Sequence, residues 1–235
     1  MKWWPGLMLV VAVATITAAS PEPRQPARPP LAVAFLYDLT MSAGGFGKPV
    51  SQDHQLQNVT ECVVGELAPV DTLRFGFITS RLYLSRPYAA SEMTDFYRKV
   101  VRPTVVSSSD RVGPSPVWDA IDRAVSLLAS DNGRRAVIAM TDGMSTGNVH
   151  SASDVVNHAK SAGVSISGIF AGNPFLLWKD WPVHPGEALS AMATETGGLY
   201  VVPKGEEYRE IRQLSPVSRK NLNKAVELIF EKLRR

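Results

Sequence analysis

The sequence predicts an α/β domain: a doubly wound, mostly parallel central sheet with helices on both faces. Segments 31–37 and 136–140 are almost uniformly apolar and rich in β-favouring residues, which is typical of strands buried on both faces of a parallel sheet. Strand-like and helix-like segments also alternate along the chain. Repeated strand–helix units of this kind build a parallel sheet covered by helices.

The expected elements follow one another with short connections. An amphipathic pattern predicts a helix over 54–67, which contains the only cysteine, Cys62, on its apolar face. Segment 81–84 lies close enough to the strand 71–79 to be its antiparallel partner, which predicts one antiparallel edge strand. Gly163 closes one of the later helices. The remaining helices are expected at 92–101, 117–129, 152–162, 187–196 and 221–233, and the remaining strands at 164–170 and 199–202.

Length and composition are those of one soluble domain. The chain has 235 residues, of which 45% are hydrophobic and 20% charged, enough for a sizeable core. The net charge of +3 comes from scattered basic residues, so the sequence offers no nucleic-acid footprint. With a single cysteine it offers neither a disulfide pair nor a cysteine zinc site.

The N-terminus has the features of a targeting segment. Lys2 precedes an apolar stretch at 7–19, and small residues surround position 20, which predicts a signal peptide over 1–20 and an exported, secreted or periplasmic protein. An uncleaved N-terminal membrane anchor is the alternative. Residues 21–30 contain five prolines and are expected to form an extended spacer. The domain is therefore expected to span 31–235.

Oxygen-bearing side chains follow the first strand. Asp38, Thr40 and Ser42 occupy alternate positions just past its expected end, and α/β sheets bind ligands at the carboxyl ends of their strands. An acid and two hydroxyls are hard donors that suit Mg²⁺ or Mn²⁺. Ordinary turn residues are the competing interpretation.

Two later segments supply similar groups. Ser115 lies in a loop before a helix, and Asp142 follows the buried strand 136–140. In a doubly wound sheet this strand can lie beside the first one, so Asp38, Thr40, Ser42, Ser115 and Asp142 would meet in one crevice. Two carboxylates and three hydroxyls could hold a hard divalent ion.

These segments resemble the von Willebrand factor type A (VWA) family, whose metal-ion-dependent adhesion site (MIDAS) reads Asp-x-Ser-x-Ser, then a loop Thr, then an Asp. Asp38-Leu-Thr-Met-Ser42 matches the first element with Thr for the first Ser. Pro114-Ser-Pro-Val-Trp-Asp-Ala120 resembles the second element, with Ser115 in the Thr position, and Thr141-Asp-Gly143 matches the third. Segment 191–200 is similar to a late helix–strand junction of the family. The resemblance covers about 31–202 and implies a Rossmann-like VWA fold.

The resemblance also implies roles for the residues. Thr40 and Ser42 would ligate the ion directly, Asp38 and Asp142 directly or through water, and Ser115 when a ligand is bound. The ion's open position would then take a carboxylate from a protein partner, which is recognition and not catalysis. A VWA domain that binds its partner without metal is the alternative.

The sequence supports an enzymatic function less well than recognition. The Asp pair of a phosphotransferase is missing, because position 40 is Thr, and the Gly44–Lys48 run lacks the spacing of a phosphate loop. A metal-dependent hydrolase or phosphotransferase is therefore the third interpretation. The aromatic segment 173–185 follows another strand, and its Trp178 and Trp181 either pack onto the domain or contact a partner.

Overall fold

The computed structural model describes residues 28–40, 49–104, 111, 113–171, 185–203 and 219–235. The signal peptide expected at 1–20, most of the spacer, and the site candidates Ser42, Trp178 and Trp181 lie outside these ranges. Among the described residues, no helix has the length and apolar character needed to cross a membrane.

The described part of the chain forms one seven-stranded sheet. Its main order is β3-β2-β1-β5-β6-β7, and β1, β2, β5, β6 and β7 run parallel. The strand bounds are Leu31–Asp38 for β1, Thr72–Ile78 for β2, Leu82–Leu84 for β3, Tyr88–Ala89 for β4, Arg134–Thr141 for β5, Val164–Phe170 for β6 and Tyr200–Val201 for β7. The doubly wound architecture expected from the VWA resemblance is confirmed.

The antiparallel edge is divided between two short strands. β3 pairs with the end of β2 at Gly76–Ile78, as expected, and β4 pairs with its beginning at Thr72–Leu73. β4 has no signal in the sequence, because it is only two residues long and therefore too short to show an alternating pattern.

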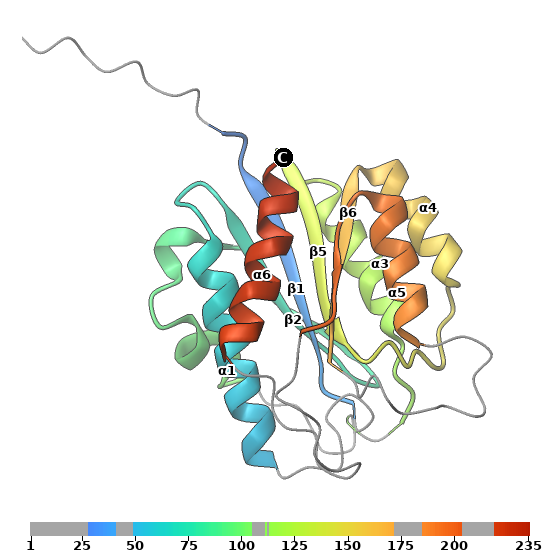
Figure 1. Ribbon diagram of the computed structural model, residues 1–235, viewed down its shortest axis with the longest axis horizontal. Helices are drawn as coiled ribbons and strands as arrows, with labels where there is room; N and C mark the ends of the chain where they lie inside the picture. The colour runs from blue at the N-terminus through green and yellow to red at the C-terminus, as the bar shows by residue number, and fades with distance from the viewer. Residues whose placement is uncertain (1–27, 41–48, 105–110, 112, 172–184, 204–218) are drawn as a thin grey trace, which may run out of the picture.

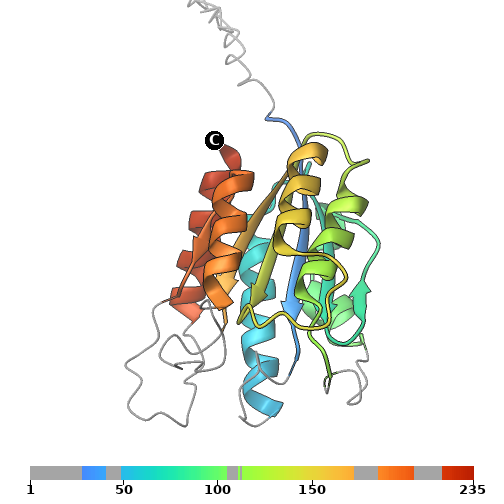
Figure 2. The same cartoon turned by 90° about the vertical axis from the view of Figure 1, so that its right-hand side faces the viewer.

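Helices cover both faces of the sheet (Figures 1 and 2). α1 (Pro49–Glu66) and α6 (Arg219–Arg234) lie side by side on one face, and α3 (Val117–Leu128), α4 (Ala152–Ala162) and α5 (Pro185–Thr196) cover the other. β1 is completely buried between these layers. Its Val33 and Phe35 belong to the core cluster beneath α1 and α6, whereas Ala34 and Leu36 belong to the cluster beneath α3, α4 and α5, because successive strand residues point to opposite faces.

The end of α4 is fixed by local chemistry. Gly163 closes the helix in the left-handed conformation with φ 62°, as the sequence predicts, because glycine has no Cβ to clash there. At the other end, Ser151 accepts a hydrogen bond from the backbone N–H of Asp154, whose carboxylate accepts one from the backbone N–H of Ser151.

The prediction of a single helix over 92–101 is wrong. The chain forms a 3₁₀ turn at Ala90–Glu92 and a short π-helix at Tyr97–Val101. Between them Asp95 has φ 59°, a left-handed conformation that ends a right-handed helix. Met93 and Phe96 are nevertheless buried in the core. The apolar residues that indicated a helix therefore face the core from two shorter turns.

The last residues of the expected spacer contact the domain. Arg28 Nη2 pairs with the buried carboxylate of Asp71 at 2.5 Å, and Asp71 Oδ1 accepts from the N–H of Leu31. The carbonyl of Pro30 accepts from the N–H of Arg134 at 2.9 Å.

Candidate metal site

The predicted acids meet at the carboxyl edge of the sheet, the lower edge in Figure 1. β1 and β5 are parallel neighbours with Tyr37 opposite Met140, so Asp38 and Thr141 end adjacent strands. The Thr141 hydroxyl donates to Asp38 Oδ2 at 2.6 Å, and Asp142 follows directly. The expected proximity of the Asp38 and Asp142 segments is thus observed.

Asp38 lies at the centre of a network of hydroxyl groups. Its Oδ1 accepts from both the backbone N–H and the hydroxyl of Thr40, at 2.9 and 2.6 Å, while Oδ2 accepts from Thr141. The residue is only 3% exposed. Burial raises the pKa of the Asp38 carboxyl, and the hydrogen bonds from Thr141 and Thr40 oppose that rise. A nearby cation would further favour the ionised form.

Tyr37, the residue before Asp38, is buried in the core cluster beneath α1 and α6. Burial, followed by the charge of Asp38, raises the pKa of its phenol. Tyr37 therefore remains neutral at physiological pH and contributes packing beneath the edge, not a charge.

Ser115 is held by the loop that follows β5. The Ser115 N–H donates to Thr146 Oγ1 at 2.9 Å, and the Thr146 N–H donates to the Ser115 carbonyl at 2.8 Å. The side chain is 4% exposed, yet its Oγ has no hydrogen-bond partner among the described residues. A buried hydroxyl without a hydrogen-bond partner lowers the stability of the folded state. A ligand that bonds to Ser115 Oγ would remove this cost.

Asp142 is likewise buried, at 4% exposure. Its Oδ1 accepts from the backbone N–H of Met144 at 2.9 Å. The Gly143 N–H donates to the hydroxyl of Thr141 at 3.0 Å. These bonds fix the turn that follows β5 and hold the Asp142 carboxylate at the edge of the sheet.

Asp119 of α3 anchors the far end of the same loop. Its two carboxylate oxygens accept from the backbone N–H groups of Val149 and His150, each at 2.9 Å, and the His150 ring lies 2.9 Å from Oδ1. Burial raises the pKa of Asp119, but these bonds outweigh it and lower the pKa overall. The same pairing raises the pKa of His150. Asp119 thus steadies the loop after β5, which in turn holds Ser115.

Asn148 adds a second anchor within that loop. Its Oδ1 accepts from the Trp118 N–H at 2.9 Å, and its side-chain amide donates to Ser145 Oγ at 2.8 Å. The loop is thus tied to the first turn of α3 at several points, although it has no regular secondary structure.

The donor set suits a hard divalent cation. A hydroxyl that donates its proton to a carboxylate, as Thr40 does to Asp38, retains acceptor lone pairs. Within the described ranges, no three His, Cys, Asp or Glu side chains gather as a metal site. An ion here would therefore depend on hydroxyl ligands, for which Mg²⁺ and Mn²⁺ are suited. Thr40 and Ser115 would hold it together with Asp38 and Asp142.

Two positioning residues of the site were not among the predicted ligands. Thr141 belongs to the Thr-Asp-Gly motif, and its hydroxyl orients Asp38. Thr146 orients the Ser115 loop through two hydrogen bonds. The Thr141 side chain could have been placed from its position beside Asp142 at the end of a strand. The Thr146 contact had no signal in the sequence, because it joins residues 31 positions apart.

Comparison with solved structures shows the fold. The chain is similar to proximal thread matrix protein 1 (PTMP1) from the mussel byssus, in a structure with a zinc-occupied MIDAS motif, with 16% identity, a TM-score of 0.62, and coverage of 87% of this chain and 46% of PTMP1. It is also similar to an aerotolerance-related membrane protein from Bacteroides fragilis, with 16% identity, a TM-score of 0.56, and coverage of 86% and 98% of the two chains. The D319A mutant of the PilB minor pilin from Streptococcus sanguinis gives 9% identity, a TM-score of 0.58, and coverage of 90% and 63%.

No protein-family model matches the chain, and a search of curated proteins gave no significant match. At these identities the similarity to solved structures supports the doubly wound fold alone. The chemistry proposed below therefore depends on the residues at the carboxyl edge of this chain.

Proposed function

We propose that this chain is an exported VWA domain that binds a protein partner through a divalent cation held by Asp38, Thr40, Ser115 and Asp142, with Ser42 completing the set. The observation that carries the proposal is the unpaired, buried hydroxyl of Ser115. It lies in a loop bonded to the segment that follows Asp142. A bound Mg²⁺ or Mn²⁺ supplies an electrophilic position for an oxygen ligand such as a partner's carboxylate.

The described residues of the site hold and orient one another, and none of them has the arrangement of a nucleophile with its base. Asp38 is held by hydroxyls of Thr40 and Thr141. The loop that follows β5 contains one histidine, His150, and its ring pairs with Asp119 of α3. Recognition, not catalysis, is therefore the function we propose. The zinc-occupied MIDAS motif of PTMP1 supports a divalent metal in this fold, and the donor set favours Mg²⁺ or Mn²⁺ here.

We further propose that Trp178 and Trp181, which lie outside the described residues, contact the partner. Their segment follows β6, whose carboxyl end lies at the same edge of the sheet as Asp142. Trp178→Ala should weaken partner binding by on the order of tenfold or more, as expected for an aromatic anchor, and should preserve the response to metal. Unfolding of this variant would show instead that the segment packs onto the core.

Export is the setting that the N-terminal sequence favours. The similar B. fragilis protein is a membrane protein and PTMP1 belongs to the mussel byssus, which supports placement outside the cytoplasm. We expect a mature N-terminus near residue 20. N-terminal sequencing that finds Met1 on the membrane-bound protein would establish the uncleaved anchor instead.

A metal-free interaction module is the second candidate, and one observation favours it. Both oxygens of Asp38 and Oδ1 of Asp142 already accept hydrogen bonds from the chain itself. Such a network can hold the edge together without a cation, leaving the partner to bind through shape and polar contacts alone.

Thermal unfolding distinguishes the two candidates. A ligand bound only by the folded state stabilises it by about 2.7 kcal/mol at a hundredfold excess over Kd, so Mg²⁺ should raise the Tm relative to EDTA. Asp38→Ala and Asp142→Ala should abolish this difference. Asp131→Ala is the matched control, because Asp131 pairs with Arg74 away from the site, and it should retain the difference. Equal Tm values of the unchanged protein in Mg²⁺ and EDTA would favour the metal-free module.

Partner capture from an exported fraction, with and without EDTA, tests the recognition step. The metal proposal predicts capture in Mg²⁺ and its loss in EDTA. Capture that survives EDTA and the Asp38→Ala substitution would assign binding to a surface other than the metal site.

A further inference from the structure

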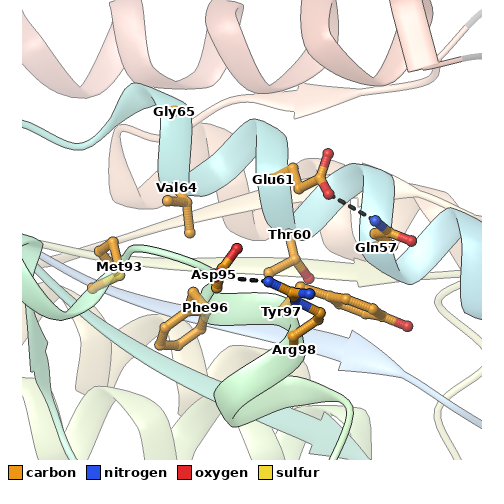
Figure 3. Close-up of a pocket in the computed structure, with 10 residues that line it drawn as sticks. All are labelled: Gln57, Thr60, Glu61, Val64, Gly65, Met93, Asp95, Phe96, Tyr97 and Arg98. Carbon is orange, nitrogen blue, oxygen red and sulfur yellow. Dashed lines mark hydrogen bonds and ion pairs between the residues drawn. The ribbon is translucent and has the colours of Figure 1, made fainter.

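A cavity lies between α1 and the segment 93–98 (Figure 3). Its volume is about 550 Å³, within the range of about 300–1,000 Å³ typical of ligand sites. Val64, Met93 and Phe96 give it an apolar end, Thr60 and Arg98 lie at the other end, and Asp95 lies between them.

The polar end contains an unsatisfied group. Thr60 is 1% exposed, and its Oγ1 has no hydrogen-bond partner among the described residues. The hydroxyl of a helical threonine can bond to a carbonyl one turn earlier, and that of Thr60 does not. In Figure 3 Thr60 points from α1 toward Tyr97 and Arg98, across the cavity.

The opposite wall has an unusual backbone. Asp95 has φ 59°, and it is the one non-glycine residue with positive φ among those described. The π-helix Tyr97–Val101 follows at once. Left-handed non-glycine residues and π-turns both concentrate at functional sites, because other requirements maintain them against their cost. Here they bring Asp95 and Arg98 together at 2.8 Å.

The charges at this cavity cancel locally. Asp95 pairs with Arg98, and Glu61, the other acid of the lining, pairs with Arg219 of α6 at 2.9 Å. A free ion therefore gains little here. A carboxylate beside a guanidinium instead offers an acceptor next to several donors, which complements the N–H and C=O of a peptide group.

We propose that this cavity binds an extended, uncharged peptide segment of a partner protein. One apolar side chain of the segment lies against Val64, Met93 and Phe96, and a backbone amide bonds to Thr60 and to the Asp95–Arg98 pair. The residues of this cavity are not those proposed to hold the metal, and peptide binding here does not require a cation.

Methionine methyl groups provide the test. The chain has seven methionines; Met93 lines the cavity, and Met144 lies beside Asp142 at the metal site. With the full-length protein labelled at its methionine methyls, N-acetyl-leucine amide should shift the Met93 signal saturably at millimolar concentration. It should leave the Met144 signal in place, with or without EDTA. N-acetyl-glycine amide, which lacks the apolar side chain, should bind at least tenfold more weakly.

Two substitutions sharpen the result. Thr60→Val keeps the shape and removes the hydroxyl, so binding should weaken about fivefold, the equivalent of one hydrogen bond of about 1 kcal/mol. A Cβ at Gly65, which also lines the cavity, meets nothing within 4 Å, so Gly65→Leu should fill the space and abolish the Met93 shift. Gly65→Ala is the matched control and should bind normally.

Three results would overturn the proposal. One is an unchanged Met93 signal at millimolar N-acetyl-leucine amide. Another is equal binding of the leucine and glycine amides, which would show that no apolar side chain is recognised. The third is normal binding by both Thr60→Val and Gly65→Leu, which would place the probe elsewhere. Loss of the Mg²⁺ effect on Tm with the Met93 shift retained would reject only the metal site.

Discussion

Ser115→Ala is the substitution whose effect depends most sharply on the presence of metal. In the metal-free protein the Ser115 hydroxyl is buried and has no partner among the described residues. Alanine removes this group without changing the backbone bonds that the residue makes with Thr146. The variant should therefore be more stable than the unchanged protein in EDTA and less responsive to Mg²⁺.

The magnitudes follow from the two states of the hydroxyl. An unsatisfied buried polar group costs about 1–3 kcal/mol, so we expect a gain of about 1 kcal/mol in EDTA. For a domain of this size that corresponds to a rise of about 2–4 °C in Tm. If the lost ligand weakens metal binding tenfold, the stabilisation by saturating Mg²⁺ falls by about 1.4 kcal/mol.

Chemical denaturation in EDTA and in saturating Mg²⁺ measures both effects on the same samples. Ser145→Ala is the control, because Ser145 Oγ is bonded within the loop, at 2.8 Å from the Asn148 amide, and its loss should destabilise the protein in both conditions. Our reasoning would be refuted if Ser115→Ala were destabilised in EDTA and kept the full response to Mg²⁺.

Two further predictions concern the scaffold. Asp71→Ala should destabilise the domain by about 3 kcal/mol or more in denaturant unfolding, because it leaves the N–H groups of Leu31 and Ala68 without their acceptor; a loss below about 1 kcal/mol would contradict this. The hydrogen bond to Asp119 raises the pKa of His150. The stabilisation of the folded state by this pair should therefore be complete below the unfolded-state pKa of His150, about 6.5, and disappear as the pH rises through its pKa in the folded state. Asp119, with its lowered pKa, stays ionised throughout this window, so His150→Gln should flatten the stability profile there, and an unchanged profile would show that the pair contributes nothing.

The sheet could be predicted from the sequence because its strands are buried on both faces. Segments such as 31–37 and 136–140 leave few alternatives to a central parallel strand, and Gly163 marks a helix end that the structure confirms. The region 92–101 could not be predicted by periodicity. Met93 and Phe96 have helical spacing, but the conformation of Asp95 interrupts the helix, and propensity alone does not reveal a single left-handed residue.

The sequence was sufficient to place the site's acids at the ends of two strands. Asp38 and Asp142 follow apolar strands, and the neighbouring positions of β1 and β5 bring their segments together. What the sequence could not supply was the internal bonding. Thr141 binding to Asp38, and Thr146 holding Ser115, depend on contacts between distant segments that only the folded chain creates. Ser42, Trp178 and Trp181 remain predictions, because they lie outside the described residues.

Anomalous diffraction from crystals grown with Mn²⁺ tests the metal site most directly. Our account predicts one strong anomalous peak at the carboxyl edge of the sheet, with the oxygens of Thr40, Ser115, Asp38 and Asp142 around it, directly or through water. Asp38→Ala crystals should lack this peak. The absence of a peak at millimolar Mn²⁺, or a peak bound only to other residues, would contradict the metal site.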